Sequence, residues 1–272
     1  MWSRRAVRGA VGTSRSRDHR GMAVLEDRTI LVVVPARGGS KGVKLKNIGE
    51  LNGVPLVALA GRVVRRLSWV DRAVVSTDHE RIAEIARESG LDVPFMRPAE
   101  LSGDFVADWD VLHHALLECE RIDGRRYDVV VMLQPTSPLR RAEHVTATVE
   151  KLLKGGYDAV WTVSETDSKA HPLKQLVIRD DILDYYDPAG AQIIARQQLT
   201  PVYHRNGVAY AMTRDCIVRK KSIKGDNTSF VLVEGPVANI DTEFDFRLAE
   251  FILHMSEGAG GKTVPENTPS RK

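Results

Sequence analysis

Residues 29–42 read TILVVVPARGGSKG, a short continuous apolar run followed at once by a loop rich in glycine and positive charge. An apolar run of this length predicts a strand buried on both faces, as in a parallel sheet that helices cover on both sides. In open α/β sheets, ligands bind beyond the carboxyl ends of the strands. The stretch therefore predicts an α/β fold and makes this loop the first candidate for a binding site.

The same alternation of short apolar runs with helical patterns continues as far as residue 163. Further strands are expected at Ala73–Ser76, Asp128–Leu133 and Asp158–Val163, and helices at Pro55–Leu67, His79–Ser89, Asp108–Arg121 and Ala142–Leu153. This β-α-β rhythm predicts a doubly wound, mostly parallel sheet.

The rhythm changes after Val163. The expected elements are two strands within Leu173–Tyr186 joined by a turn at Arg179–Asp181, strands at Gly207–Met212 and Phe230–Val233, and a closing helix at Thr242–His254. Thr242 is the expected N-cap of that helix, and Asp245 lies in its first turn. Because residues 165–205 interrupt the sheet, we predict that they form a small inserted β arm, which serves as a lid or as a dimerisation arm.

The two ends of the chain differ from its body in composition. Residues 1–21 hold six arginines and one aspartate, so they carry +5, and the total of +3 leaves −2 for residues 22–272. A nearly neutral body does not indicate nucleic-acid binding. We expect a disordered basic head at 1–28, with Met22 as an alternative start, one domain at 29–254 and a disordered tail at 255–272. A transit peptide is the alternative interpretation of the head.

Cysteine usage and hydropathy narrow the class of protein further. The two cysteines, Cys119 and Cys216, have no Cys-x-x-Cys spacing, so neither a disulfide framework nor a zinc knuckle is indicated. A reducing, cytoplasmic location is therefore expected. No apolar run reaches the ~18 residues that a membrane-spanning helix needs, so no membrane partner is expected.

The loop after the first strand places four positive charges within ten residues, at Arg37, Lys41, Lys44 and Lys46. Its glycines allow backbone N–H groups to approach an anion closely. A triphosphate needs this combination of backbone donors and flexible cations. Because neither a Walker A loop nor a dinucleotide fingerprint is present, we predict another kind of nucleotide-phosphate loop.

Residues 36–47, ARGGSKGVKLKN, resemble the nucleotide loop of the acylneuraminate cytidylyltransferases (CMP-sialic acid synthetases), with Lys44 where that family usually has proline. Further matches are STD at 76–78, RPAEL at 97–101, LQPTSPLR at 133–140, HPLK at 171–174 and RQQ at 196–198. The resemblance covers about residues 29–254. It implies a Rossmann-like nucleotidyltransferase that transfers CMP from CTP to a nine-carbon 2-keto acid sugar and releases pyrophosphate.

The resemblance also implies roles for individual residues. Nucleotide binding is implied for Arg37, Lys41, Asn47, Arg97, Val106, Asp108 and Gln134. Catalytic roles are implied for Arg37, Lys46, Arg196 and Asp241, and sugar binding for Lys174, Gln134, Gln198 and His204. The chemistry is suitable, since an amide such as that of Gln134 offers a donor and an acceptor to a pyrimidine edge, and an arginine can stabilise charge on phosphate oxygens.

Two departures from the family pattern concern the sugar and the metal. In the segment YHRNG (203–207), Arg205 lies one position later than the arginine of many relatives. In the segment ANIDT (238–242), Asn239 replaces the first of two carboxylates that many relatives carry. Magnesium accepts oxygen ligands and keeps water and substrate phosphates in its shell, so we expect Mg²⁺ to be held by Asp241 with Asn239. A homodimer is expected from the resemblance.

Three other functions remain open from the sequence. The first is the related cytidylyltransferase for the eight-carbon sugar KDO, against which the long LQPTSPLR and RQQ matches count. The second is a nucleotide-sugar glycosyltransferase, which should carry Asp-x-Asp at a strand end, whereas Asp108-Trp109-Asp110 lies at an expected helix start. The third is a non-catalytic nucleotide-binding scaffold, suggested by Asn239.

Overall fold

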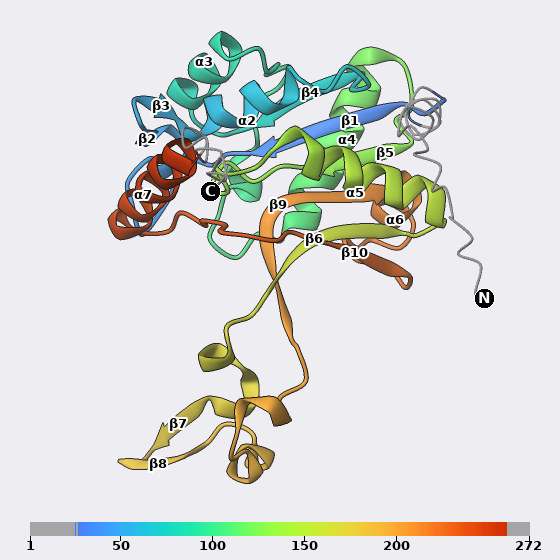
Figure 1. Cartoon of the computed structure of the whole chain (residues 1–272). Coiled ribbons are helices and arrows are strands. Elements are labelled where there is room, and N and C mark those ends of the chain that lie inside the picture. Colours follow the sequence, from blue (N-terminus) through green and yellow to red (C-terminus); the bar gives the residue numbers. More distant parts are fainter. Residues whose placement is uncertain (1–24, 26, 260–272) are drawn as a thin grey trace, which may run out of the picture.

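The computed structural model describes residue 25 and residues 27–259, and its centre is a six-stranded sheet (Figure 1). In spatial order the strands are β10 (Thr228–Leu232), β6 (Ala159–Glu165), β9 (Tyr203–Thr213), β5 (Val129–Met132), β1 (Ile30–Pro35) and β4 (Arg72–Ser76). All neighbouring strands run parallel except where β9 pairs with β5 and β6. The predicted mostly parallel sheet is therefore confirmed.

Helices cover both faces of this sheet. One face is covered by α2 (Leu56–Val64), α3 (Glu80–Glu88) and α5 (Ala142–Gly155), and the other by α4 (Asp108–Asp123) and α6 (Arg214–Val218). Strand β1 contributes to both cores, since Val32 and Val34 pack in one, and Leu31 and Val33 in the other. This explains why its sequence is continuously apolar rather than alternating, and it confirms the doubly wound arrangement.

A third, smaller core lies beside the sheet, where the hairpin of β2 (Glu50–Leu51) and β3 (Val54–Pro55) meets the closing helix α7 (Glu243–Ala259). Helix α7 begins as predicted: the carboxylate of Asp245 accepts hydrogen bonds from the backbone N–H and the hydroxyl of Thr242. It ends later than predicted, at Ala259, five residues past His254.

The expected head and tail can be compared with the structure only at their inner ends. Leu25 is fully buried in the core that includes α2 and α5, so the head ends earlier than residue 28. Residues 255–259 are helical and belong to the body rather than to the tail. The rest of both segments, residues 1–24, 26 and 260–272, lies outside the described residues.

The predicted β arm is present and extends away from the sheet (Figure 1). Strands β6 and β9 lead into it, and it carries a two-stranded sheet of β7 (Leu176–Arg179) and β8 (Ile182–Tyr185). Asp180 and Asp181 form the turn between them with positive φ angles of 50° and 64°. Four 3-10 turns complete the arm, at Ser168–Ala170, Pro172–Lys174, Pro188–Gln192 and Arg196–Gln198.

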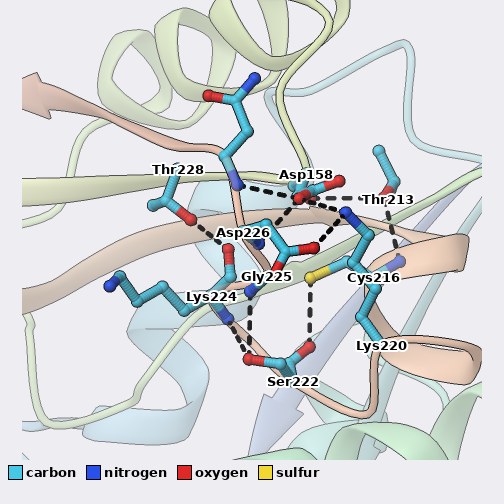
Figure 2. Close-up of polar contacts among 10 residues, drawn as sticks. Asp158, Thr213, Cys216, Lys220, Ser222, Lys224, Gly225, Asp226 and Thr228 are labelled. Atoms are coloured by element: carbon cyan, nitrogen blue, oxygen red, sulfur yellow. Dashed lines mark hydrogen bonds and ion pairs between the residues drawn. The ribbon is translucent and has the colours of Figure 1, made fainter.

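A polar network fastens the edge strand β10 to the rest of the sheet (Figure 2). The carboxylate of Asp158, just before β6, accepts hydrogen bonds from the Lys220 ammonium group at 2.7 Å and from the backbone N–H groups of Asp226 and Asn227 at 2.9 Å. Gly225 approaches Asp158 so closely that a Cβ there would lie 2.6 Å from the Cβ of Asp158. The network holds the loop between α6 and β10.

Neither cysteine is engaged in a disulfide, and both are buried. Burial raises the pKa of Cys119 to about 12 and that of Cys216 to about 11, so both thiols stay protonated at neutral pH. In the part of the chain that the structure describes, no helix is both long and apolar enough to cross a membrane.

Candidate active site

A pocket of about 600 Å³ opens at the carboxyl edge of the sheet, beyond β1 and β5. Four segments line it: the loop after β1, the approach to α4, the loop after β5 and the residues just before α7. They meet because β1 and β5 are parallel neighbours whose carboxyl ends share one edge. Nine of the predicted site residues line this pocket: Arg37, Lys41, Lys46, Asn47, Arg97, Val106, Asp108, Gln134 and Asp241.

Two cations of the predicted phosphate loop share one carboxylate. Asp104, from the approach to α4, lies 2.8 Å from the Arg37 guanidinium and 2.6 Å from the Lys41 ammonium group. Its hydrogen bonds to Lys41 and Arg37 lower the pKa of Asp104, so this carboxyl is ionised at neutral pH. One anionic group thus already bridges the two cations that we expect to bind phosphate.

A second ion pair joins the phosphate loop to the start of α7. The Lys46 ammonium group lies 2.6 Å from Oδ1 of Asp241, and Gly42 packs against the carbonyl oxygen of Asp241 so closely that no side chain fits there. The Asp241 side chain is 67% exposed and opens into the pocket. Because the carboxylate of Asp245, in the first turn of α7, accepts hydrogen bonds from the backbone N–H groups of Asp241 and Thr242, the carboxylate of Asp241 is available for Lys46 and for a ligand.

The floor of the pocket is held by two buried polar residues. Arg97 donates from Nε to the hydroxyl of Ser76 at 3.0 Å and from its terminal nitrogen to the Ser76 carbonyl. Burial lowers the pKa of Arg97 to about 10, which leaves it charged at neutral pH. Asn47 donates to the carbonyl oxygen of Arg37 at 2.9 Å and so fixes the shape of the phosphate loop.

Gln134 is positioned by the buried Arg140. The Arg140 guanidinium donates to the carbonyl oxygens of Gln134 at 2.5 Å, of Gly207 at 3.0 Å and of Val208. Gly207 has a φ of +71°, and a Cβ there would lie 2.5 Å from Oε1 of Gln134. Only glycine fits this position, so the backbone of β9 at Gly207 packs directly against the Gln134 side chain.

Five predicted site residues do not line the pocket of their own chain. Lys174, Arg196 and Gln198 lie on the arm, which extends away from the sheet, and His204 lies at its base, where Nδ1 is 3.0 Å from the hydroxyl of Thr166. Asn239, the second expected ligand of the metal, is exposed and does not line the pocket either.

Asp241 is the pocket carboxylate that was expected to bind Mg²⁺. Among the described residues, no group of three histidine, cysteine or acidic side chains is arranged to hold a metal ion. A hard oxygen-preferring cation such as Mg²⁺ keeps several waters and can be bound through one or two carboxylates plus substrate phosphates. Asp241, exposed beside the phosphate-loop cations, fits such a site, in which substrate supplies most of the ligands.

Three functional candidates were missed from the sequence. Asp104 lies in an exposed Gly-Asp-Phe loop, for which no pattern indicates a partner. Arg140 ends the segment LQPTSPLR, and its burial and three carbonyl contacts make it the support of Gln134. Arg205 lies in the segment that departs from the family pattern, and its guanidinium lies 3.9 Å from the pocket residue Asp108.

A parallel sheet with a cation-rich, glycine-containing loop and a polar pocket at its carboxyl edge is the architecture of a nucleotide-binding α/β protein. Residues 31–235 match the family model described as cytidylyltransferase. N-acylneuraminate cytidylyltransferase A of Danio rerio is 39% identical over 89% of this chain and 54% of its own length. CMP-N,N'-diacetyllegionaminic acid synthase of Legionella pneumophila is 31% identical over 85% of this chain and 98% of its own length.

The chain therefore belongs to the cytidylyltransferase family, as the motifs predicted. The solved structure of CMP:2-keto-3-deoxy-manno-octonic acid synthetase in complex with CTP has the same fold, with a TM-score of 0.62 over 84% of this chain and 99% of that one. Its sequence identity is only 16%, so this likeness concerns the fold alone.

Asp104→Asn should tighten nucleotide binding, because we expect the triphosphate to displace Asp104 from both Arg37 and Lys41. Exposed ion pairs are weak, so we expect the KM for CTP to fall only roughly two- to fivefold. The matched control is Glu150→Gln, which removes an equally short ion pair with Lys154 on α5 and should leave KM unchanged. A raised KM in the Asp104 variant would show instead that this carboxylate positions the cations for phosphate.

Proposed function

We propose that this protein transfers CMP from CTP to the anomeric hydroxyl of a nonulosonic acid, a nine-carbon 2-keto acid sugar, and releases pyrophosphate. The observation that carries the proposal is the pocket. It gathers on one chain every residue to which the motifs assigned nucleotide binding, together with the catalytic candidates Lys46 and Asp241. The named relatives support the substrate class, since their names refer to N-acylneuraminate and diacetyllegionaminic acid.

In this reaction the sugar hydroxyl attacks the α-phosphorus, a new P–O bond forms, and the bond to the β-phosphate oxygen breaks. Arg37, Lys41 and Lys46 lie where they can bind the phosphates and stabilise the charge that moves onto pyrophosphate. Gln134 and the buried Arg97 present polar groups that can recognise the nucleoside. Catalysis then rests on positioning and electrostatics, and needs no covalent intermediate with the protein.

We propose that Mg²⁺ assists this reaction and that Asp241 is its protein ligand. When bound, the ion would neutralise phosphate charge and help to align the attack. Lys46 holds one oxygen of Asp241 at 2.6 Å, which keeps the carboxylate directed at the phosphate loop. Asn239, the other expected ligand, does not line the pocket, whereas Asp241 does.

We also propose that the chain is a homodimer, in which the arm of one subunit completes the pocket of the other. The arm exposes a set of large apolar side chains that the described part of its own chain leaves uncovered: Leu176, Ile178, Ile182, Leu183, Tyr186 and Ile194. It also carries Lys174, Arg196 and Gln198, which do not line the pocket of their own chain. A second copy related by twofold symmetry would bury the apolar set and receive these polar residues reciprocally.

Mixing two inactive variants tests this arrangement. Arg196→Ala removes a residue of the arm, and Asp241→Asn removes one of the pocket. If the site is shared, a mixed dimer regains one intact site, and an equal mixture should recover about a quarter of the wild-type rate after subunit exchange. Mixing Arg37→Ala with Asp241→Asn is the control, because both lesions lie in the same pocket. Equal recovery in the two mixtures, or none in either, would contradict a shared site.

The sugar class is tested by pyrophosphate release with CTP fixed and the acceptor varied. We expect turnover with N-acetylneuraminate, diacetyllegionaminate or pseudaminate and much less with the eight-carbon acid KDO. Preference for KDO would reverse the assignment of the sugar while leaving the cytidylyltransferase class intact. A cytosolic location remains a prediction from the cysteine content.

A further inference from the structure

Each cation around the pocket is paired with a carboxylate of the protein, except for the buried Arg97. Asp104 bridges Arg37 and Lys41, and Asp241 holds Lys46. Since these pairs lie on the phosphate loop, the protein carboxylates occupy positions where substrate phosphates are expected. A third pair of the same kind lies off the phosphate loop, where Oδ2 of Asp108 approaches the guanidinium of Arg205 at 3.9 Å.

Arg205 lies close to the pocket, because its guanidinium approaches the pocket residue Asp108. It precedes Gly207 by two residues on β9, and Gly207 packs against the Gln134 side chain. Asp108 and Gln134 both line the pocket, so Arg205 lies at its rim rather than on a remote surface. Its side chain is 47% exposed, which leaves it accessible to a ligand.

Two aromatic rings hold the guanidinium in place. Arg205 lies over the ring of Trp161 at 5.1 Å and over that of Tyr210 at 5.7 Å. Both rings are themselves fixed, since Trp161 donates to the carbonyl of Ile223 and the Tyr210 hydroxyl accepts from the backbone N–H of Gly207. A guanidinium resting on aromatic faces keeps its N–H edge free for a planar anion.

The contact between Asp108 and Arg205 does not occupy the N–H donors of the guanidinium. A separation of 3.9 Å is too long for a hydrogen bond, so Asp108 attracts the guanidinium without occupying its donors. The phosphate-loop pairs are much shorter, at 2.6–2.8 Å. Arg205 is therefore the pocket cation most readily transferred from the protein to a substrate carboxylate.

We infer that Arg205 binds the carboxylate of the acid sugar and so selects an acid over a neutral sugar. This inference rests on the proposed function, which supplies two kinds of substrate anion, the triphosphate and the sugar carboxylate. The phosphate-loop cations can bind the triphosphate. The two parallel N–H donors of the Arg205 guanidinium match the geometry of the sugar carboxylate. Lys174, to which the sequence assigned sugar binding, lies on the arm and is not placed at this pocket by its own chain.

The test compares Arg205→Met with wild type, using the acid sugar and its carboxamide, in which the carboxylate is replaced by a neutral group. Wild type should prefer the acid strongly, and Arg205→Met should raise the KM for the acid roughly 10- to 100-fold while the KM for CTP stays within about twofold. Its KM for the carboxamide should equal that of wild type. Arg205→Lys should recover only part of the preference, because ammonium lacks the planar fork.

Arg125→Met is the matched control, since Arg125 also lies over an aromatic ring, that of Tyr127 at 4.9 Å, and is 42% exposed, but it lies outside the pocket. It should leave both KM values unchanged. The inference is overturned if Arg205→Met raises the KM for CTP, if it keeps the preference for the acid, or if Lys174→Met abolishes that preference instead. Absence of turnover by the wild type with any acid sugar would overturn the proposed function itself.

Discussion

Asp241→Asn should lower kcat by at least roughly 10²-fold, the scale found when one electrostatic stabiliser of a transition state is removed. The substitution leaves a neutral amide beside Lys46 and takes away the carboxylate that we propose as the protein ligand of Mg²⁺. The KM for CTP should change less than kcat, because the lost interaction is strongest in the transition state. Steady-state pyrophosphate release at several magnesium concentrations measures both effects.

The stability of the Asp241 variant separates this role from a structural one. The start of α7 is held by Asp245, a residue of the first turn whose carboxylate accepts hydrogen bonds from the backbone N–H groups of Asp241 and Thr242. Asp245→Ala should therefore lower the free energy of unfolding by about 1 kcal/mol and reduce kcat less than tenfold. Asp241→Asn should leave the melting temperature near that of wild type. A destabilised Asp241 variant with normal kcat would show that Asp241 serves the helix and not the reaction.

Arg140→Met should be strongly destabilising, although Arg140 does not line the pocket. Its guanidinium is buried and donates to three backbone carbonyl groups, which would all lose their partner. Leaving a buried acceptor unsatisfied costs about 1–3 kcal/mol. We therefore expect a loss of about 3 kcal/mol, or about 6–12 °C in melting temperature for a chain of this size.

The control for Arg140 is Arg219→Met, which breaks an exposed ion pair with Asp215 within one helical turn and should leave the melting temperature unchanged. Because Arg140 holds the carbonyl of Gln134, the Arg140 variant should also bind CTP more weakly under conditions in which it remains folded. A melting temperature within about 2 °C of wild type would contradict the structural role assigned to Arg140.

The sheet and the phosphate loop could be predicted from the sequence because their signals are local. β1 is an unbroken apolar run, and Arg37, Lys41 and Lys46 follow it within a few residues. The start of β9 was missed, since Tyr203–Asn206 is too polar to resemble a buried strand. The additional turns of α7 were missed because the residues after His254 show no apolar periodicity.

The rest of the site depends on contacts between residues that are distant in the sequence. Asp104 forms an ion pair with Arg37, which lies 67 residues away in the sequence. Arg140 supports Gln134 because its guanidinium donates both to the Gln134 carbonyl and to the Gly207 carbonyl on β9. No local pattern reports either contact. Arg196 was assigned to the site by its motif, but the motif carries no information on whether the arm serves its own pocket or that of a second copy. That distinction depends on the direction in which β6 and β9 leave the sheet.

The most direct test of the central claim is pyrophosphate release by the wild-type protein with a nonulosonic acid and each of CTP, UTP, ATP and GTP in turn. The pocket lined by Arg97, Val106 and Gln134 predicts strong preference for CTP, with product formed only when acid sugar and nucleotide are both present. Turnover with UTP equal to or greater than that with CTP would contradict the account.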